Sequence, residues 1–443
     1  MTGLHTLSDI LAIAGISPAT DLDPNHEVIR CLELRDELGL VNVISSYSRL
    51  IDLDQLAEVS GRALFAAGHP DVPAVDVLEN EKRPLIVDRS LLEAESLVLK
   101  DPDQGGHYQL TASQLLHLLS RYDWVSGDFT RPLEEINSLC NDAVLDEDNI
   151  NTAVTRFTTR RIRQRIEDTL DFPPMPEIAN RILQIGGDDK ATVHDLSEVV
   201  GLDPSLSAQV VSWAASPYYA APGKVKSIDD AIMRVLGFDL VMNLALGLAL
   251  GKTLRMPKDG RHGYRQYWRQ AVHGATLMEA LTKAMPPERR QSAGTGYLAG
   301  LLHNFGLLIL SELMRPQLNR ICAFSEANSH AGHPAVERHL LGATREQMAA
   351  CLMRFWHLPE EVIVALRYQH DNHYAGPYAD LSKLLFITNR LLGDEQIGTA
   401  ARAPIPEHLY QDLGIAPSAL TEISERIRES ADDLQSIART LAA

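Results

Sequence analysis

Residues 297–310 read YLAGLLHNFGLLIL, an apolar run that only His303 and Asn304 interrupt. The run is shorter than the ~20 apolar residues that a membrane-spanning helix requires. A second apolar run, at residues 240–250, is shorter still and contains Asn243. Both runs are therefore typical of buried core helices in a soluble α-helical domain.

The sequence around these runs, residues 172–392, is dominated by helical patterns that prolines punctuate. Pro173, Pro174 and Pro176 open the segment, and proline does not fit a helix interior. In the WHLP step at residues 356–359, the proline disfavours helical geometry at the preceding residue and fits the first position of a new helix. These signals predict a compact all-α domain. Residues 417–443 predict one further amphipathic helix.

Residues 27–122 have a different pattern, in which short strands alternate with helices. Runs at 41–45 and 85–87 predict strands, and a turn is expected at Gly68-His69-Pro70. Helices are predicted at 54–60 and 111–120, the second with Thr111 as its N-cap. Strand signals fade after Trp124. The pattern predicts an α+β domain in this part of the chain.

We therefore expect a multidomain chain with an N-terminal α+β domain followed by an all-α helical bundle. The predicted boundaries are an α+β domain at 1–125, a helical linker at 126–170, the bundle at 171–395, and a helical extension at 396–443 that packs on the bundle. The linker contains a basic cluster from Arg156 to Arg165. Its side chains spread around a helix, so we expect a solvated surface there, with docking of an anionic partner as the alternative.

Composition excludes several classes of function. With 45% hydrophobic and 23% charged residues, the chain of 443 residues has an ordinary folded composition. Its formal net charge of −18 disfavours binding to DNA or to an anionic membrane. The four cysteines form no CxxC pair, and residues 1–16 carry no Lys or Arg. We therefore expect reduced thiols, no secretory signal and a cytoplasmic location.

A series of short motifs gives the helical segment a family resemblance. In chain order they are FPPMP at 172–176, GLDPSLS at 201–207, SPYY at 216–219, SIDDAI at 227–232, GLLHNFG at 300–306, WHLP at 356–359 and YQHD at 368–371. Together they resemble an HDOD domain. The resemblance implies a helical bundle related to the HD and HD-GYP phosphohydrolases, usually joined to other modules and acting in bacterial signal transduction.

An HD hydrolase uses imidazoles and carboxylates to hold divalent ions that activate water. By the resemblance, His273 and His303 occupy the first two histidine positions, whereas Asn304 replaces the Asp of the His-Asp pair.

The remaining positions of the site also depart from the hydrolase pattern. Arg345 occupies the third histidine position, Gln369-His370 the expected histidine pair, and Asn389 the closing Asp. Because an amide supplies no negative charge and a guanidinium repels a cation, we expect no metal, no cofactor and no catalysis here. These seven positions could instead line a pocket for a phosphate or a nucleotide, with Arg345 pairing the anion.

The first domain resembles, more faintly, the bacterial aminoacyl-tRNA editing (YbaK-like) deacylases. The motifs are LIDLDQLA at 50–57, PLIVDRSLL at 84–92 and LTASQLL at 110–116. Such a domain uses a lysine near its first strand and a loop that holds the ester. Arg30 stands at the lysine position, and Gly68 and His69 belong to the loop, so these residues are the candidate pocket. Arginine keeps the charge but changes the geometry, which favours binding over catalysis.

Four functions follow from these observations. The first is a non-catalytic signal-transduction protein, a pseudoenzyme that binds protein partners or a small nucleotide-like ligand, with a homodimer left open. The alternatives are a metal-dependent phosphodiesterase acting on a cyclic dinucleotide and an aminoacyl-tRNA editing deacylase. The fourth is a DNA-binding regulator, because residues 193–214 have a helix–turn–helix rhythm. That segment's second helix contains no Lys or Arg, which disfavours DNA binding.

Overall fold

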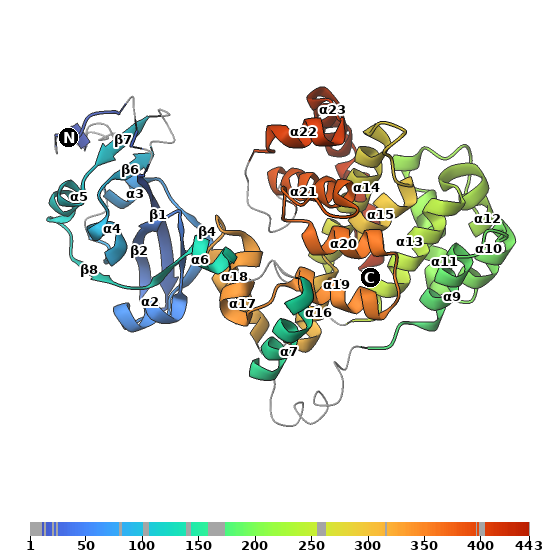
Figure 1. Cartoon of the computed structure of the whole chain (residues 1–443), viewed down its shortest axis with the longest axis horizontal. Coiled ribbons are helices and arrows are strands. Elements are labelled where there is room, and N and C mark those ends of the chain that lie inside the picture. The colour runs from blue at the N-terminus through green and yellow to red at the C-terminus, as the bar shows by residue number, and fades with distance from the viewer. Residues whose placement is uncertain are drawn as a thin grey trace. The chain divides into compact units, whose positions relative to one another are not determined.

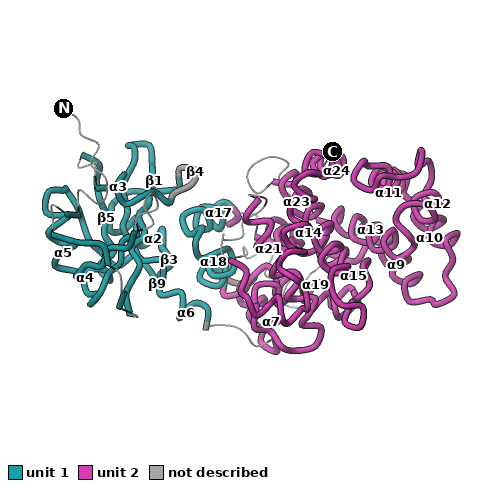
Figure 2. Tube along the Cα trace, turned by 90° about the horizontal axis from the view of Figure 1, so that it is seen from above, with its two compact units in different colours: residues 1–141, 319–341 teal, residues 142–318, 342–443 magenta. Residues whose placement is uncertain are grey.

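The computed structural model describes most of the chain. The residues outside the description are 1–10, 13–14, 20–21, 24, 79–81, 101–105, 139–142, 158–172, 255–262, 315–316, 396, 398–403 and 443. Most of the basic cluster predicted in the linker falls among these residues. The described chain forms two compact units (Figure 2). The first unit comprises residues 1–141 and 319–341, and the second comprises residues 142–318 and 342–443.

The first unit contains the strands of the molecule that the structure describes. They are β1 (Glu27–Asp36), β2 (Gly39–Ser46), β3 (Arg49–Ile51), β4 (Phe65–Asp71), β5 (Leu85–Asp88), β6 (Leu97–Lys100), β7 (His107–Leu110), β8 (Trp124–Gly127) and β9 (Thr130–Pro132). Seven of them form one mixed sheet in the order β7-β6-β1-β2-β5-β8, with β4 pairing β1. Strands β1 and β2 are antiparallel, whereas β5 runs parallel to both β2 and β8. Strands β3 and β9 form a separate antiparallel pair.

The helices of the first unit follow local signals in the sequence. They are α2 (Leu53–Ser60), α3 (Ala74–Leu78), α4 (Arg89–Glu93), α5 (Ala112–Leu119), α6 (Leu133–Ser138), α17 (Leu318–Ala327) and α18 (Gly332–Leu341). Thr111 caps α5 in a capping box with Gln114, as predicted. Leu91 of α4 and Leu115 of α5 join Ile44 and Val87 of the sheet in one apolar core. Burial of such side chains is the main stabilising contribution to the unit.

Three details of the first unit differ from the sequence prediction. The predicted turn at Gly68-His69-Pro70 lies within strand β4, which pairs with β1. Strands β8 and β9 extend past Trp124, where strand signals fade. Helices α17 and α18, which lie inside the predicted bundle in the sequence, fold with the first unit (Figure 2). In each case the structure of the segment depends on pairing or packing with residues that are distant in sequence. Local sequence patterns contain no information on such contacts.

The second unit is entirely helical in its described part. Its elements up to residue 284 are η1 (Ala143–Leu145), α7 (Asp146–Phe157), α9 (Glu177–Gly186), α10 (Val193–Gly201), α11 (Pro204–Ala214), η2 (Pro217–Tyr219), α12 (Ile228–Asp230), the π-helix η3 (Ala231–Leu236), α13 (Phe238–Gly251) and α14 (Tyr264–Ala284). The remaining elements are α15 (Ala293–Leu302), α16 (Phe305–Leu313), α19 (Arg345–Phe355), α20 (Glu360–Tyr368), α21 (Ala379–Asp394), α22 (Glu407–Leu413), α23 (Pro417–Glu429) and α24 (Ala431–Leu441). Figure 1 shows their arrangement.

Helix α14 is central to the second unit. It packs against α15, α21, α23 and α24. The residues predicted as one C-terminal helix form two, α23 and α24, which Ser430 separates. Pro359 is the N-cap of α20, one position before the predicted first helical turn. Local sequence signals thus gave the helices but missed the exact positions of their ends.

Helix α7, which was predicted as linker, belongs to the helical unit. The carboxylate of Asp146 accepts hydrogen bonds from Arg367 Nε at 2.5 Å, Arg367 Nη2 at 2.8 Å and Gln347 Nε2 at 2.6 Å. Because all three residues are largely buried, this charge-assisted contact fixes the start of α7 against α19 and α20.

The apolar run at residues 297–310 is divided between α15 and α16. By length and composition alone, residues 293–313 could cross a membrane, but 89% of that window is buried inside the protein. Burial of this kind is typical of a core helix, as the sequence predicted.

Candidate functional site

The two histidines of the candidate site lie on adjacent helices of the second unit. His273 is on α14, and its Nδ1–H donates to the backbone oxygen of Arg269 at 2.8 Å. His303 ends α15, and its Nδ1–H donates to the backbone oxygen of Gly300 at 2.6 Å. Both side chains are buried. Each ring is therefore held in the tautomer that leaves Nε2 without a proton.

Two glycines allow α14 and α15 to approach closely at this place. A Cβ atom added at Gly274 would lie 2.8 Å from the His303 ring and 2.9 Å from the backbone oxygen of Gly300. A Cβ atom added at Gly300 would lie 2.7 Å from the Cα atom of Ala275. Real side chains do not tolerate such distances, so glycine at both positions is required for His303 to sit against α14.

The amide side chains that replace the acidic ligands form hydrogen bonds with one another and with the main chain. Asn389 Nδ2 of α21 donates to Gln369 Oε1 at 3.0 Å. Gln369 Nε2 in turn donates to the backbone oxygen of His303 at 2.9 Å. Asn304 Nδ2 donates to Gln270 Oε1 of α14. We call Asn304, Gln369 and Asn389, with Gln270, the amide network. Its hydrogen bonds form two separate pairs of neutral groups, Asn304 with Gln270 and Asn389 with Gln369.

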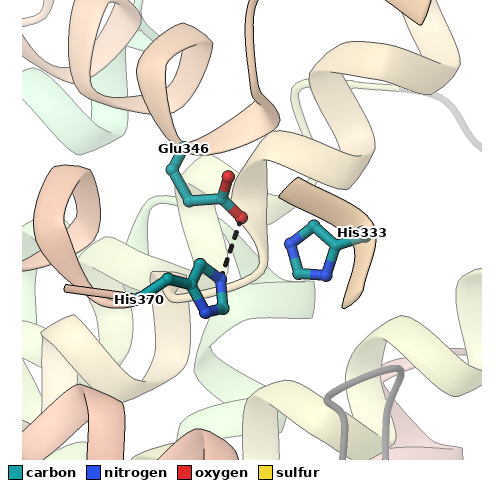
Figure 3. Close-up of side chains that lie close together, drawn as sticks. All are labelled: His333, Glu346 and His370. Carbon is teal, nitrogen blue, oxygen red and sulfur yellow. Dashed lines mark ion pairs between the residues drawn. The ribbon is translucent and has the colours of Figure 1, made fainter. Parts of the chain in front are cut away.

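A buried carboxylate that the sequence analysis missed lies at the start of α19. Oε1 of Glu346 is 3.3 Å from Nε2 of His370, and Glu346 is 4% exposed (Figure 3). Arg345 precedes it and is also buried, with its main chain against Gly306. An acidic residue in the first turn after the Thr344 cap is usual at a helix N-terminus. For this reason the sequence pattern gave no sign that Glu346 belongs to the site. Figure 3 also labels His333 of α18, a residue of the other unit.

Burial controls protonation at the two histidines. The pKa of His303 is lowered to about 4, mainly by burial and in smaller part by the nearby His370, while the hydrogen bond to Gly300 and the charge of Glu346 oppose the shift. Burial likewise lowers the pKa of His273. Both imidazoles are therefore neutral at pH 7 and able to accept a hydrogen bond at Nε2.

The donor set fits a dinuclear metal centre poorly. Two ions of charge +2 need several anionic oxygens, but the predicted positions supply neutral amides and the Arg345 guanidinium. Gln369 Oε1, an oxygen that could face an ion, instead accepts from Asn389. At this site, Glu346 and His370 place a carboxylate close to an imidazole. The arrangement can bind a polar ligand through neutral donors and acceptors, with a single carboxylate beside them.

The candidate pocket of the first unit has a different character. Arg30 on β1 is fully buried, and its Nε donates to Asp71 Oδ1 at 2.5 Å. Its Nη2 donates to the backbone oxygen of Ala327, at the end of α17, at 2.9 Å. Gly68 and His69 lie on the neighbouring strand β4. Arg30, Gly68 and His69 thus lie on the paired strands β1 and β4. The Arg30 side chain contacts the end of α17.

Comparison with known proteins identifies the family. The model of the HDOD domain matches residues 172–372. A crystal structure from Marinobacter aquaeolei VT8, titled "Putative signal transduction protein", is 35% identical and covers 98% of this chain and 99% of its own. The two structures superpose with a TM-score of 0.86. The chain therefore contains an HDOD domain at residues 172–372, as the motifs predicted.

More distant similarities show the fold alone. An HDOD domain protein of unknown function from Geobacter sulfurreducens is 20% identical, with a TM-score of 0.52, over 66% of this chain and 98% of its own. A protein of Treponema pallidum (strain Nichols) is 24% identical over 246 residues, 55% of this chain. The chain spans about half the length of that relative, since the match covers 45% of it.

Proposed function

We propose that this HDOD protein is a non-catalytic signal-transduction protein that acts by binding a protein partner or a small anionic ligand such as a nucleotide. It would work in the cytoplasm, without a metal or another cofactor, as a monomer or a homodimer. The resemblance to the Marinobacter signal transduction protein over nearly the whole chain supports the general role. The chemistry of the candidate site supports the absence of catalysis.

The amide network is the observation that carries this proposal. A vacated metal site would keep its oxygens directed at the ion, ready to bind. In this protein the Asn389 amide donates to Gln369, and Gln369 donates to the main chain at His303. These hydrogen bonds satisfy buried polar groups that an ion would otherwise have to satisfy. An ion entering the site would have to break them and would gain no negative charge in return.

The test is gain of metal binding through restored carboxylates. We expect the double variant Asn304→Asp, Asn389→Asp to bind Mn²⁺ at least about ten-fold more tightly than the wild type, since each carboxylate adds the charge that the amide lacks. Isothermal titration calorimetry measures both affinities. The matched control is Asn180→Asp, an exposed residue of α9, which should change nothing. Equal Mn²⁺ affinity in the double variant and the wild type would contradict the proposal.

A metal-dependent phosphodiesterase is the second candidate, and the Glu346–His370 pair favours it. A carboxylate and an imidazole 3.3 Å apart are two ligands that a single divalent ion accepts. The assay is hydrolysis of cyclic dinucleotides in the presence of Mn²⁺ or Fe²⁺. Turnover that Glu346→Gln and His303→Ala both abolish would establish this function. We expect no turnover from the wild type.

We also propose that the first unit is related to the aminoacyl-tRNA editing deacylases and has lost their catalysis. The motifs at residues 50–57 and 84–92 support the relationship, and the burial of Arg30 under α17 supports the loss. Hydrolysis of misacylated tRNA is the test. Activity that Arg30→Ala removes would show that the unit is an enzyme. We expect no hydrolysis.

A further inference from the structure

Helices α17 and α18 form a helical hairpin that belongs to the HDOD sequence but folds with the first unit. The HDOD match spans residues 172–372, and residues 319–341 within it join the first unit (Figure 2). The chain therefore leaves the second unit and returns to it through this hairpin. Helix α18 packs on α6, and Arg338 of α18 donates to Asn137 of α6 at 3.0 Å.

The turn of the hairpin occupies the free edge of strand β3. One edge of β3 pairs with β9. On the other edge, the backbone N–H of Ile51 donates to Asn328 Oδ1 at 2.7 Å, and Asn328 Nδ2 donates to the backbone oxygen of Ile51 at 2.9 Å. His330 Nε2–H donates to the backbone oxygen of Arg49 at 3.0 Å. Side chains thus make the contacts that a neighbouring strand would make.

Polar contacts continue from this edge to the buried Arg30. Ala327 accepts from Arg30, and Ser329 Oγ donates to Asp71 Oδ2 at 2.9 Å. Farther along the hairpin, His339 Nε2 donates to Asp52 Oδ2 at 2.9 Å. Each of these hydrogen bonds contributes only about 1 kcal/mol net, because on opening both partners bond to water instead. Interfaces between the parts of one chain resemble those of separable partners.

The hairpin is joined to α19 by a short turn that contains a glycine in the left-handed region. Helix α18 ends at Leu341, and Gly342 follows with a φ of +82°, in space where an added Cβ atom would meet nothing within 4 Å. Thr344 then caps α19, whose second residue is Glu346.

We propose that the α17–α18 hairpin is a releasable clasp that opens while the sheet of the first unit stays folded. Opening uncovers Arg30 and the edge at Arg49 and Ile51. The occupant that fits this surface is the same turn presented by a second copy of the chain, because Ala327, Asn328 and His330 already supply its contacts. Opening of the hairpin goes beyond the proposed function and does not depend on it, since an active enzyme could open in the same way.

Hydrogen exchange of the full chain tests whether the clasp opens. We expect peptides that cover Arg49–Ile51 and residues 318–341 to exchange together, at least about ten-fold faster than peptides from β2. In Asn328→Ala, which loses both hydrogen bonds to Ile51, their exchange should accelerate by at least about a further ten-fold, since one such bond contributes about 1 kcal/mol. Exchange in β2 and α14 should not change. Asn180→Ala, which removes an exposed amide, is the matched control.

Binding of the hairpin in trans tests the uncovered surface. The probe is a fluorescent peptide of residues 318–341, which we expect to bind Asn328→Ala about ten-fold more tightly than the wild type. If Asn328→Ala unfolds, Asn328→Asp serves, because it keeps the acceptor for Ile51 and loses only the donor. The proposal is overturned if the hairpin exchanges hydrogen as slowly as β2 and is no faster in Asn328→Ala. It is also overturned if the peptide binds Asn328→Ala and the wild type with equal affinity.

Discussion

The candidate sites of the two units have lost accessible charge in different ways. In the helical unit the positions that the resemblance assigns to acidic ligands hold the neutral amides Asn304 and Asn389, which hydrogen-bond to Gln270 and Gln369. In the first unit the charge is kept as Arg30, but Asp71 and the hairpin enclose it. Under the proposed function, the first arrangement removes metal chemistry permanently, because the residue types themselves lack the charge. The enclosure of Arg30 is reversible, because it depends on the contact with the hairpin at Ala327.

Removal of Arg30 should give the largest loss of stability. Arg30→Ala removes a fully buried side chain and leaves the Ala327 carbonyl without its donor, whereas Asp71, whose side chain is 35% exposed, keeps the hydrogen bond from Ser329. We therefore expect the free energy of unfolding to fall by about 3 kcal/mol, mainly from the lost packing of the Arg30 side chain. Urea unfolding followed by the fluorescence of Trp124, in the first unit, measures it. Arg89→Ala, which breaks an exposed pair with Asp128, is the control and should cost less than about 1 kcal/mol. Equal losses in the two variants would remove the distinction between an enclosed and an exposed charge.

Acid should destabilise the helical unit through His303. Its pKa falls from 6.5 to about 4 on folding, so the unfolded chain binds a proton first as the pH drops. The stability that the neutral form contributes is complete above pH 6.5 and is lost toward pH 4. Between pH 7 and pH 5 we expect a loss of about 2 kcal/mol from this group.

Urea titrations at the two pH values check the contribution of His303. In His303→Asn the difference between pH 7 and pH 5 should shrink by about that amount. His330 provides the same comparison in the first unit, because burial and the charge of Arg30 lower its pKa to about 3. A pH dependence identical in His303→Asn and the wild type would show that His303 is not enclosed as described.

Disruption of the amide network should have the smallest effect. Asn389→Ala removes the donor to Gln369 Oε1, and an unsatisfied buried acceptor costs about 1 to 2 kcal/mol. Thermal unfolding monitored by circular dichroism measures the change. The exposed control Asn180→Ala should stay within about 0.5 kcal/mol of the wild type. If Asn389→Ala is as stable as that control, the amides do not stabilise the site.

The sequence predicted much of the helical unit because its signals are local. A new helix begins at the WHLP step, and the run around His303 is buried in core helices, both as predicted. The order of the motifs identified the family, and with it the positions of His303, Asn304 and Asn389. Periodicity and capping act over a few residues, so one sequence is enough to read them.

The parts that escaped prediction depend on contacts between distant residues. The hydrogen bond from Arg30 to Ala327 joins positions 297 residues apart, and that from Asn328 to Ile51 joins positions 277 apart. No local pattern specifies such a pairing. Glu346 was missed for a different reason, because a glutamate in the first turn of a helix is ordinary. Only its distance of 3.3 Å from His370 marks it as part of the site.

The most direct test of the central claim is the metal content of the wild-type protein, purified without chelators from cells supplied with manganese and iron and measured by mass spectrometry of the elements. With neutral amides at positions 304 and 389, the protein should carry no stoichiometric transition metal. One or more ions per chain, lost in His303→Ala, would contradict the claim that the site has abandoned metal chemistry.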